Sequence, residues 1–136
     1  MEKCIFCEIV AENIPCTKIY ESENILAFLD IAPVNPGHTL VIPKQHYPTL
    51  LDLPPALGQE LLEALQKVAK AIKEGLQADG INLGMNNYRA AGQLVFHAHF
   101  HLIPRYEKDG LTLWPQQKYE SETKMQEIAQ QIINKL

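Results

Sequence analysis

Leu94-Val95-Phe96-His97-Ala98-His99-Phe100-His101-Leu102-Ile103 is the stretch of this chain that decides the predicted fold. Its side chains alternate with a period of two, which is typical of a β-strand. One face of the predicted strand carries His97, His99 and His101, and the opposite face is entirely apolar and should be buried. At about 3.3 Å per residue, neighbouring imidazoles stand roughly 7 Å apart along an exposed edge of a packed sheet.

A row of three imidazoles supports two kinds of chemistry. Imidazole titrates near neutrality, so it serves as a nucleophile, a general acid or base, or an anion-binding cation. It is also a common metal ligand. The row alone leaves catalysis and metal binding equally open, and the surrounding sequence has to decide between them.

The segments around this stretch predict an α+β fold, an antiparallel sheet of about five strands with helices packed on it. Apolar patterns predict a short helix over residues 5–11 and further strands over 17–20, 25–29, 39–42 and 81–86. Apolar residues at i, i+3, i+4 spacing predict a long helix that starts near Pro54-Pro55 and ends at Ala78-Asp79-Gly80. A last helix is expected after Ser121. Its apolar face, expected to be core or dimer contact, is Met125, Ile128, Ala129, Ile132 and Leu136.

Composition predicts one globular domain over residues 1–136, with 46% hydrophobic and 21% charged residues. The net charge of −4 argues against broad nucleic-acid binding, although a small nucleotide remains compatible with it. No apolar run reaches membrane-spanning length, and the start Met1-Glu2-Lys3-Cys4 does not resemble a signal peptide. Three cysteines without a secretion signal indicate a reducing cytoplasm.

The run of residues 97–103 matches the His-x-His-x-His-x-x signature of the histidine triad (HIT) superfamily, in which x is usually hydrophobic. Four further segments resemble this superfamily and its bacterial Hit and Hint branches: residues 5–15, 26–33, 37–44 and 91–93. The resemblance extends along nearly the whole chain. It implies the same antiparallel α+β fold and a homodimer that joins two sheets.

The resemblance implies nucleotidyl transfer, in which the central His99 attacks the α-phosphorus of a nucleotide and water then hydrolyses the nucleotidyl-histidine. In this scheme His101 donates to a phosphate oxygen, and Gln93, Asn86 and the Leu94 N–H add neutral donors. Loop capping is the alternative role for Gln93 and Asn86. The family position that matches His38 lies behind the nucleophile and supports its orientation or protonation.

The resemblance also implies a nucleoside pocket. Asp30 matches the position that binds the ribose hydroxyls, for which a carboxylate offers two acceptor oxygens. Without the resemblance, Asp30 would be interpreted as a turn residue. The base is expected in an apolar slot that alone would be assigned to the core, made of Ile5, Phe6, Ile9, Phe28 and Ile31.

Cys4-Ile5-Phe6-Cys7 is a single Cys-x-x-Cys motif, which suits a redox pair, half a zinc site or unligated thiols. Some branches of the superfamily carry zinc on such a pair. Their other two ligands match His46 and His97 here, and a Cys₂His₂ set would be closed and therefore structural. Cys16 is expected to be an ordinary buried thiol.

The predicted function is hydrolysis that releases a nucleoside 5′-monophosphate, expected to be AMP, from an amine or a polyphosphate. Leu94 replaces the small or hydroxylated residue of many relatives, residues 102–106 resemble dinucleoside polyphosphate hydrolases, and Trp114-Pro115 resembles the Hint branch. The leaving group is therefore open. Phosphorolysis, a nucleotide-binding regulatory module and a purely zinc-binding protein are the alternatives, and the sequence does not name the physiological substrate, the base preference or a protein partner.

Overall fold

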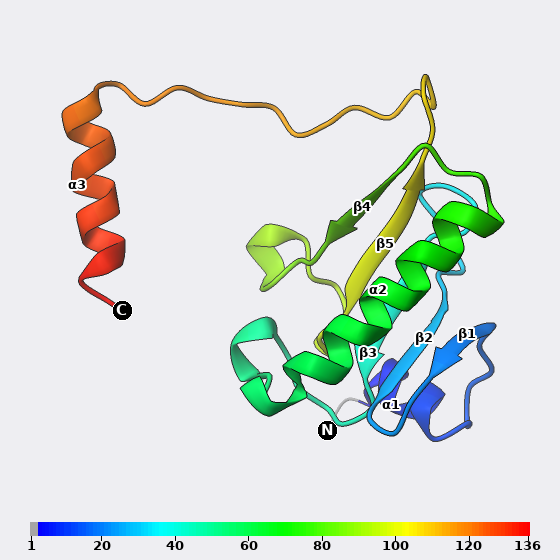
Figure 1. Ribbon diagram of the computed structural model, residues 1–136. Coiled ribbons are helices and arrows are strands. Elements are labelled where there is room, and N and C mark those ends of the chain that lie inside the picture. Colours follow the sequence, from blue (N-terminus) through cyan, green and yellow to red (C-terminus); the bar gives the residue numbers. More distant parts are fainter. Residues whose placement is uncertain (1–2) are drawn as a thin grey trace.

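The computed structural model describes residues 3–136 and contains one antiparallel five-stranded sheet with a long helix across one face (Figure 1). The strand order is β1-β2-β3-β5-β4. This confirms the predicted α+β fold and antiparallel sheet. The strands are β1 (Lys18–Glu21), β2 (Ile25–Leu29), β3 (Thr39–Pro43), β4 (Gly80–Gly84) and β5 (Phe100–Arg105). The helices are α1 (Ile5–Val10), α2 (Gly58–Gly75), α3 (Glu122–Ile133) and the 3₁₀ turns η1 (Leu50–Asp52), η2 (Pro55–Leu57) and η3 (Arg89–Ala91).

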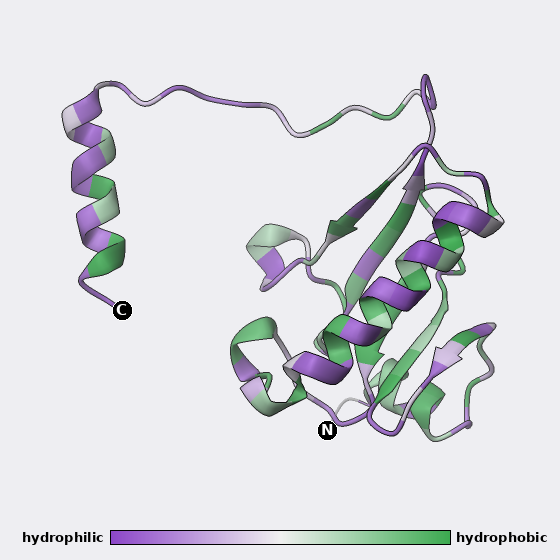
Figure 2. Cartoon of the chain, viewed as in Figure 1, coloured by the Kyte–Doolittle hydropathy of each residue, from purple (hydrophilic) through white to green (hydrophobic). Residues whose placement is uncertain are grey.

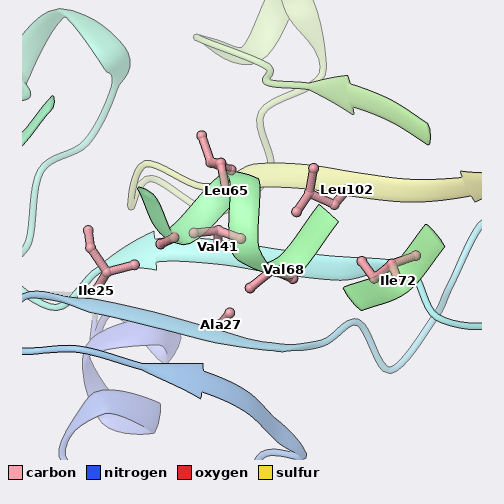
Figure 3. Close-up of a cluster of buried hydrophobic side chains, with 8 residues drawn as sticks. Ile25, Ala27, Val41, Leu65, Val68, Ile72 and Leu102 are labelled. Atoms are coloured by element: carbon pink, nitrogen blue, oxygen red, sulfur yellow. The ribbon is translucent and has the colours of Figure 1, made fainter. Parts of the chain in front are cut away.

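The main core lies between α2 and the sheet. The helical spacing of Leu65, Val68 and Ile72 places these side chains on one stripe, which packs on the middle strands (Figure 3). The outward face of α2 is mostly hydrophilic (Figure 2). Each aliphatic side chain buried here contributes about 1.5–3 kcal/mol, so this interface holds the helix on the sheet. The strand side of the cluster consists of Ile25, Ala27, Val41 and Leu102.

The short helix α1 covers part of the opposite face of the sheet. The Cys4 side chain caps its start by accepting from the Cys7 N–H at 3.4 Å. Phe6 is buried and packs edge-on against Phe28, with ring centroids 5.6 Å apart. Leu26, Leu40 and Ile42 complete this second core. The strand residues that pack with α1 come from β2 and β3, so β4 lies outside the part of this face that α1 covers.

The predicted strand over residues 94–103 is wrong in its first half, because β5 begins only at Phe100. Residues 94–99 form a loop tied to the segment after β3, where the Ala98 N–H donates to the Tyr47 carbonyl at 2.6 Å. His97 and His99 are therefore 0% and 8% exposed rather than on an open edge. On the face expected to be buried, Leu94 is 88% exposed. Each imidazole bonds a backbone carbonyl, His97 that of Pro43 in β3 and His99 that of His97, and these bonds compete with strand pairing.

The last helix begins as predicted, with the Ser121 side chain accepting from the Lys124 N–H. No side chain of α3 is buried. The helix stands clear of the rest of the chain at the end of a long extended segment (Figure 1). The alternative that its apolar face joins the core of its own chain is therefore wrong. Among residues 3–136, no helix combines the length and apolar character that a membrane span requires.

Candidate active site

A cavity of about 450 Å³ opens between α1 and the histidine triad. His99 and His101 lie in its wall beside the carboxylate of Asp30. The structure thus brings together ten of the twelve residues predicted for catalysis or substrate binding. The others of the ten are Ile5, Phe6, Ile9, Phe28, Ile31, Asn86 and Leu94. His38 and Gln93 do not line this cavity and lie behind it.

The ring of His99 is held so that one nitrogen stays free. Its Nδ1 lies 2.7 Å from the carbonyl oxygen of His97. Because a carbonyl only accepts, Nδ1 carries the proton and Nε2 keeps its lone pair. Phe6 packs edge-on against the ring at 5.2 Å between centroids, which fixes its tilt. His99 therefore presents an unprotonated nitrogen beside the cavity, as a nucleophile requires.

The ring of His101 is fixed by a chain of hydrogen bonds. The Val34 N–H donates to His38 Nδ1 at 3.1 Å, so His38 carries its proton on Nε2. His38 Nε2 then donates to His101 Nδ1 at 2.9 Å, which leaves the His101 proton on Nε2. This corrects the prediction that His38 lies behind the nucleophile: it lies behind His101. His101 Nε2 is the buried side-chain polar atom of residues 3–136 that has no hydrogen-bond partner.

Burial keeps this histidine chain neutral. It lowers the pKa of His101 to about 4, with further lowering from the neighbouring His99 and His38. Burial also lowers the pKa of His38, while the Asp30 carboxylate opposes that shift. Neutral rings agree with the donor directions deduced from the hydrogen bonds. His101 thus offers the cavity a neutral N–H donor rather than a cation.

Asp30 lies at the end of β2, where the chain turns toward β3. One carboxylate oxygen, Oδ1, accepts from the Ala32 N–H at 2.9 Å, as in the turn predicted from sequence alone. The other, Oδ2, lies 3.7 Å from His38 Nε2, and the side chain is 21% exposed. Because Oδ2 has no shorter contact, one acceptor remains for a hydroxyl group in the cavity.

Gln93 is buried, and its amide is fully used within the loop. Its Oε1 accepts from the Tyr88 N–H at 2.8 Å. Its Nε2 donates to the carbonyls of Pro48 and Val95 at 2.6 and 3.1 Å. Tyr88 has a left-handed φ of 70°, which this clamp stabilises. The geometry supports the loop-capping alternative for Gln93 over donation to a phosphate.

Asn86 stays in the cavity wall, where Gly92 approaches it closely. A Cβ added at Gly92, whose φ is +96°, would lie 3.3 Å from the Asn86 amide nitrogen. A second cavity, of about 530 Å³, meets Asn86 and His101 from the β4 side and extends to Trp114. The two cavities therefore share the histidine that carries the free N–H.

The four predicted metal donors also meet, with all donor atoms within 4.8 Å of one another. His97 Nδ1 lies 3.4 Å from Cys4 Sγ and 3.6 Å from Cys7 Sγ, and His46 Nδ1 lies 3.4 Å from Cys7 Sγ. Zinc bonds of about 2.0–2.3 Å in a tetrahedron separate N and S donors by about 3.6 Å, so the set fits that ion. His97 Nε2 donates to the Pro43 carbonyl at 2.7 Å, which turns the Nδ1 lone pair toward the sulfurs.

Several partners of these side chains are backbone groups that no residue pattern reveals. The carbonyls of Pro43, Tyr47 and Pro48 and the N–H of Val34 each orient or hold a part of the site. Tyr88 was missed as well. Gly or Asn at position 88 itself would have signalled the positive φ, whereas a bulky aromatic residue does not.

Comparisons with known proteins agree with this geometry. The HIT domain family model matches residues 11–108. "Protein hit" of Bacillus subtilis is 49% identical over 107 residues, which cover 79% of this chain and 74% of that protein. "Adenosine 5'-monophosphoramidase hnt1" of Schizosaccharomyces pombe is 46% identical and covers 82% and 83% of the two chains. "Adenylylsulfatase HINT3" of Arabidopsis thaliana is 44% identical over 79% of this chain and 55% of its own length.

Solved structures extend the similarity to the whole chain. A HIT family protein of Bacillus subtilis superposes with a TM-score of 0.91 at 42% identity, over 99% of this chain and 98% of its own. One of Bacillus anthracis gives 0.89 at 45% identity over the same shares. A Zn-bound histidine triad family protein of Mycobacterium smegmatis gives 0.76 at 41% identity, over 98% and 97% of the two chains.

Proposed function

The chain belongs to the HIT domain family, and we propose that it hydrolyses a conjugate of adenosine 5′-monophosphate through a nucleotidyl-His99 intermediate. One observation carries the proposal: a lone pair on His99 Nε2 and an unpartnered N–H on His101 Nε2 lie at one cavity, with ring centroids 5.0 Å apart. A nucleophile beside a neutral donor is what attack on a phosphate group requires.

In the first step His99 Nε2 forms a bond to phosphorus, and the bond from phosphorus to the leaving group breaks with its electron pair. The imidazole becomes a cation, which the His97 carbonyl stabilises by accepting from Nδ1. His101 Nε2–H donates to a non-bridging oxygen. Water then attacks phosphorus, the N–P bond breaks back to neutral His99, and AMP leaves with the oxygen of that water. Positioning and charge stabilisation supply most of the rate in such transfers.

The nucleoside half of the substrate fits the cavity between α1 and the triad. Phe6, Ile9 and Phe28 offer an apolar wall for a base, and Asp30 Oδ2 offers an acceptor for a ribose hydroxyl. Two relatives are named as an adenosine 5'-monophosphoramidase and an adenylylsulfatase, so the adenylyl group is constant and the leaving group varies. We assign the leaving group to the second cavity, which reaches His101 from the β4 side.

We propose that zinc binds Cys4, Cys7, His46 and His97 in a structural role. The four donors close the tetrahedron, so the ion would tie α1 to the loop that carries His99. A bound ion also takes the His97 lone pair, which leaves the phosphate chemistry to His99 and His101. Burial and the adjacent Cys4 raise the pKa of Cys7 to about 11, so a cation is needed to hold the thiolate at neutral pH.

We propose a homodimer as the working form and the cytoplasm as its compartment. Within residues 3–136 the β4 strand pairs only with β5, so its other edge can pair with a second copy. Asn82, Leu83 and Gly84 on β4 are exposed, and Leu83 has 57% of its surface free. The three cysteines are all free thiols, which fits a reducing compartment.

The test is intact-protein mass spectrometry under non-acidic conditions after mixing with adenosine 5′-phosphoramidate, adenosine 5′-phosphosulfate or a diadenosine polyphosphate. AMP release is measured in parallel. The wild type is expected to show a transient adenylyl adduct and released AMP, and His99→Ala neither. His101→Asn keeps the nucleophile and should form the adduct slowly. Equal turnover by wild type and His99→Ala would overturn the proposal, and nucleotide binding without turnover would favour the regulatory module.

A further inference from the structure

Leu94 is an apolar side chain that lies in the open beside the two cavity histidines. It lines the cavity between α1 and the triad together with His99 and His101, yet it is 88% exposed. The neighbouring Gln93 fixes the backbone at this point, because its buried amide makes three hydrogen bonds within the loop. A side chain so exposed contributes little to the free energy of unfolding, so we expect its effect on what enters the cavity.

The side chains around the reacting atoms offer hydrogen bonds but no releasable proton. His99 carries its proton on Nδ1, where the His97 carbonyl accepts it. His101 is neutral and keeps its Nε2–H as a hydrogen-bond donor, since burial lowers its pKa to about 4. Asn86 is a neutral amide, and Leu94 has no polar side-chain atom. An atom that needs a proton in order to leave phosphorus therefore finds no general acid among these four side chains.

Two further polar side chains of this cavity do not supply the missing acid. The Asp30 carboxylate accepts from the Ala32 N–H and offers acceptors alone. Cys16 lies at the opposite end of the cavity from the triad. Together with Ile9 and Pro15 it also borders a neighbouring pocket of about 210 Å³, which none of the triad histidines lines. Its thiol is therefore remote from the bond that breaks.

The second cavity, which we assign to the leaving group, has one permanent positive charge, and that charge is already paired. Arg105 is the one lysine or arginine among the described residues that line it. Its Nε and one Nη donate to the Asp109 carboxylate at 2.8 and 3.0 Å, and the other Nη donates to the Asn82 amide oxygen at 2.6 Å. Much of the remaining lining is apolar and includes Met85, Ile103, Leu111, Leu113 and Trp114. A leaving group with several negative charges finds no free cation here.

On the basis of the proposed function, we infer that Leu94 makes the site selective for leaving groups that depart as weakly basic oxygen anions and against amines. When His99 Nε2 bonds to phosphorus in such a substrate, the P–O bond breaks with its electron pair. The departing oxygen keeps that pair without a proton. In a phosphoramidate the pair goes to nitrogen, and the amine leaves only when a proton reaches that nitrogen. Among oxygen anions, the second cavity favours a carboxylate with an apolar body over a polyphosphate.

The experiment uses a matched pair of substrates, benzoyl adenylate and the benzylamide of AMP. Both carry a phenyl ring, and they differ in whether oxygen or nitrogen leaves phosphorus. The full-length wild type is expected to cleave benzoyl adenylate with a kcat/KM about 100-fold or more above that of the benzylamide. Leu94→Ser adds a hydroxyl that can donate to the departing nitrogen, and we expect the ratio of benzylamide to benzoyl kcat/KM to rise about 10-fold. Leu94→Ala is the control, because it removes the same bulk without adding a donor, and it should keep the wild-type ratio.

The outcomes separate this inference from the proposed function. An unchanged ratio in Leu94→Ser, or an equal rise in Leu94→Ser and Leu94→Ala, overturns the role of Leu94 and leaves adenylate hydrolysis intact. A wild type that cleaves the benzylamide as fast as benzoyl adenylate overturns the selectivity against amines. Faster cleavage of a diadenosine polyphosphate than of benzoyl adenylate overturns the preference for a carboxylate. If the wild type releases no AMP from any of these substrates, or His99→Ala releases it equally fast, the proposed function fails and the inference fails with it.

Discussion

His97 and His99 stand two residues apart and offer opposite ring nitrogens. His97 donates from Nε2 to the Pro43 carbonyl, so its Nδ1 faces the sulfurs of Cys4 and Cys7. His99 donates from Nδ1 to the His97 carbonyl, so its Nε2 keeps a free lone pair beside the cavity between α1 and the triad. The two side chains are identical, and the backbone carbonyl that each one bonds determines which ring nitrogen keeps its lone pair. We therefore propose that the site has a binding half around His97 and a reacting half around His99.

The reacting half should show the largest effect. His99→Ala removes the proposed nucleophile, and we expect kcat/KM for an adenylyl conjugate to fall by about 10⁴-fold or more. Zinc content, measured by atomic absorption, should stay at the wild-type value because His99 is not a donor. If His99→Ala kept more than a tenth of the wild-type activity, the assignment of His99 as the nucleophile would be contradicted.

In the binding half, we expect a substitution to affect zinc content and stability more than activity. His97→Ala removes one of four metal donors, and we expect zinc content to drop and the free energy of unfolding to fall by several kcal/mol, since structural zinc contributes directly to folding. Activity should fall less than in His99→Ala, by about 10–100-fold. Cys16→Ser is the control, because Cys16 is not part of the donor group. Full zinc content in His97→Ala would contradict the assignment.

Lowering the pH should reduce the free energy of unfolding through His101, which belongs to the reacting half. Its folded pKa of about 4 lies below the ordinary 6.5, so the unfolded chain takes up the proton first as the pH falls. The stability that depends on neutral His101 is complete above pH 6.5 and is lost as the pH falls toward 4, by about 3 kcal/mol in total. Urea unfolding at pH 7.5 and 5.0 measures this loss. His101→Asn should lose less over the same interval, and an equal loss would contradict the assignment.

The smallest expected effect lies in the loop that supports both halves. Gln93→Met keeps the buried volume but removes three hydrogen bonds, and we expect the free energy of unfolding to fall by about 2 kcal/mol. If Gln93 only braces the loop, KM should stay near the wild-type value while kcat falls modestly. A large rise in KM would instead assign Gln93 to phosphate binding, as the resemblance implies.

Much of the fold follows from patterns that the chain displays directly. The strand over residues 25–29 was predicted with the bounds of β2, and the leucine spacing located α2 within a few residues of its ends. Both segments bury their apolar side chains in one layered core, so local pattern and tertiary packing agree. Ser121 as an N-cap residue likewise predicted the start of α3.

The failures have one physical cause, which is competition from backbone partners whose positions are set only by the folded chain. Residues 94–99 alternate like a strand, but carbonyls of Pro43, Tyr47 and His97 bond this segment instead. Their positions depend on the folded chain and leave no trace in the alternation. The same reason hid the place of His38, whose Nδ1 is assigned by the Val34 N–H. Residue types predicted which side chains lie close together, whereas hydrogen bonds to the backbone set the orientation of each ring.

Histidine tautomers can be measured directly by long-range ¹H–¹⁵N correlation NMR at pH 7.5 on uniformly ¹⁵N-labelled protein. The account predicts that His99 carries its proton on Nδ1, whereas His97, His38 and His101 carry theirs on Nε2. His99→Gln and His101→Gln spectra assign the two cavity rings. A His99 ring protonated on Nε2 would leave no lone pair beside the cavity and would contradict the division of the triad into a binding and a reacting half.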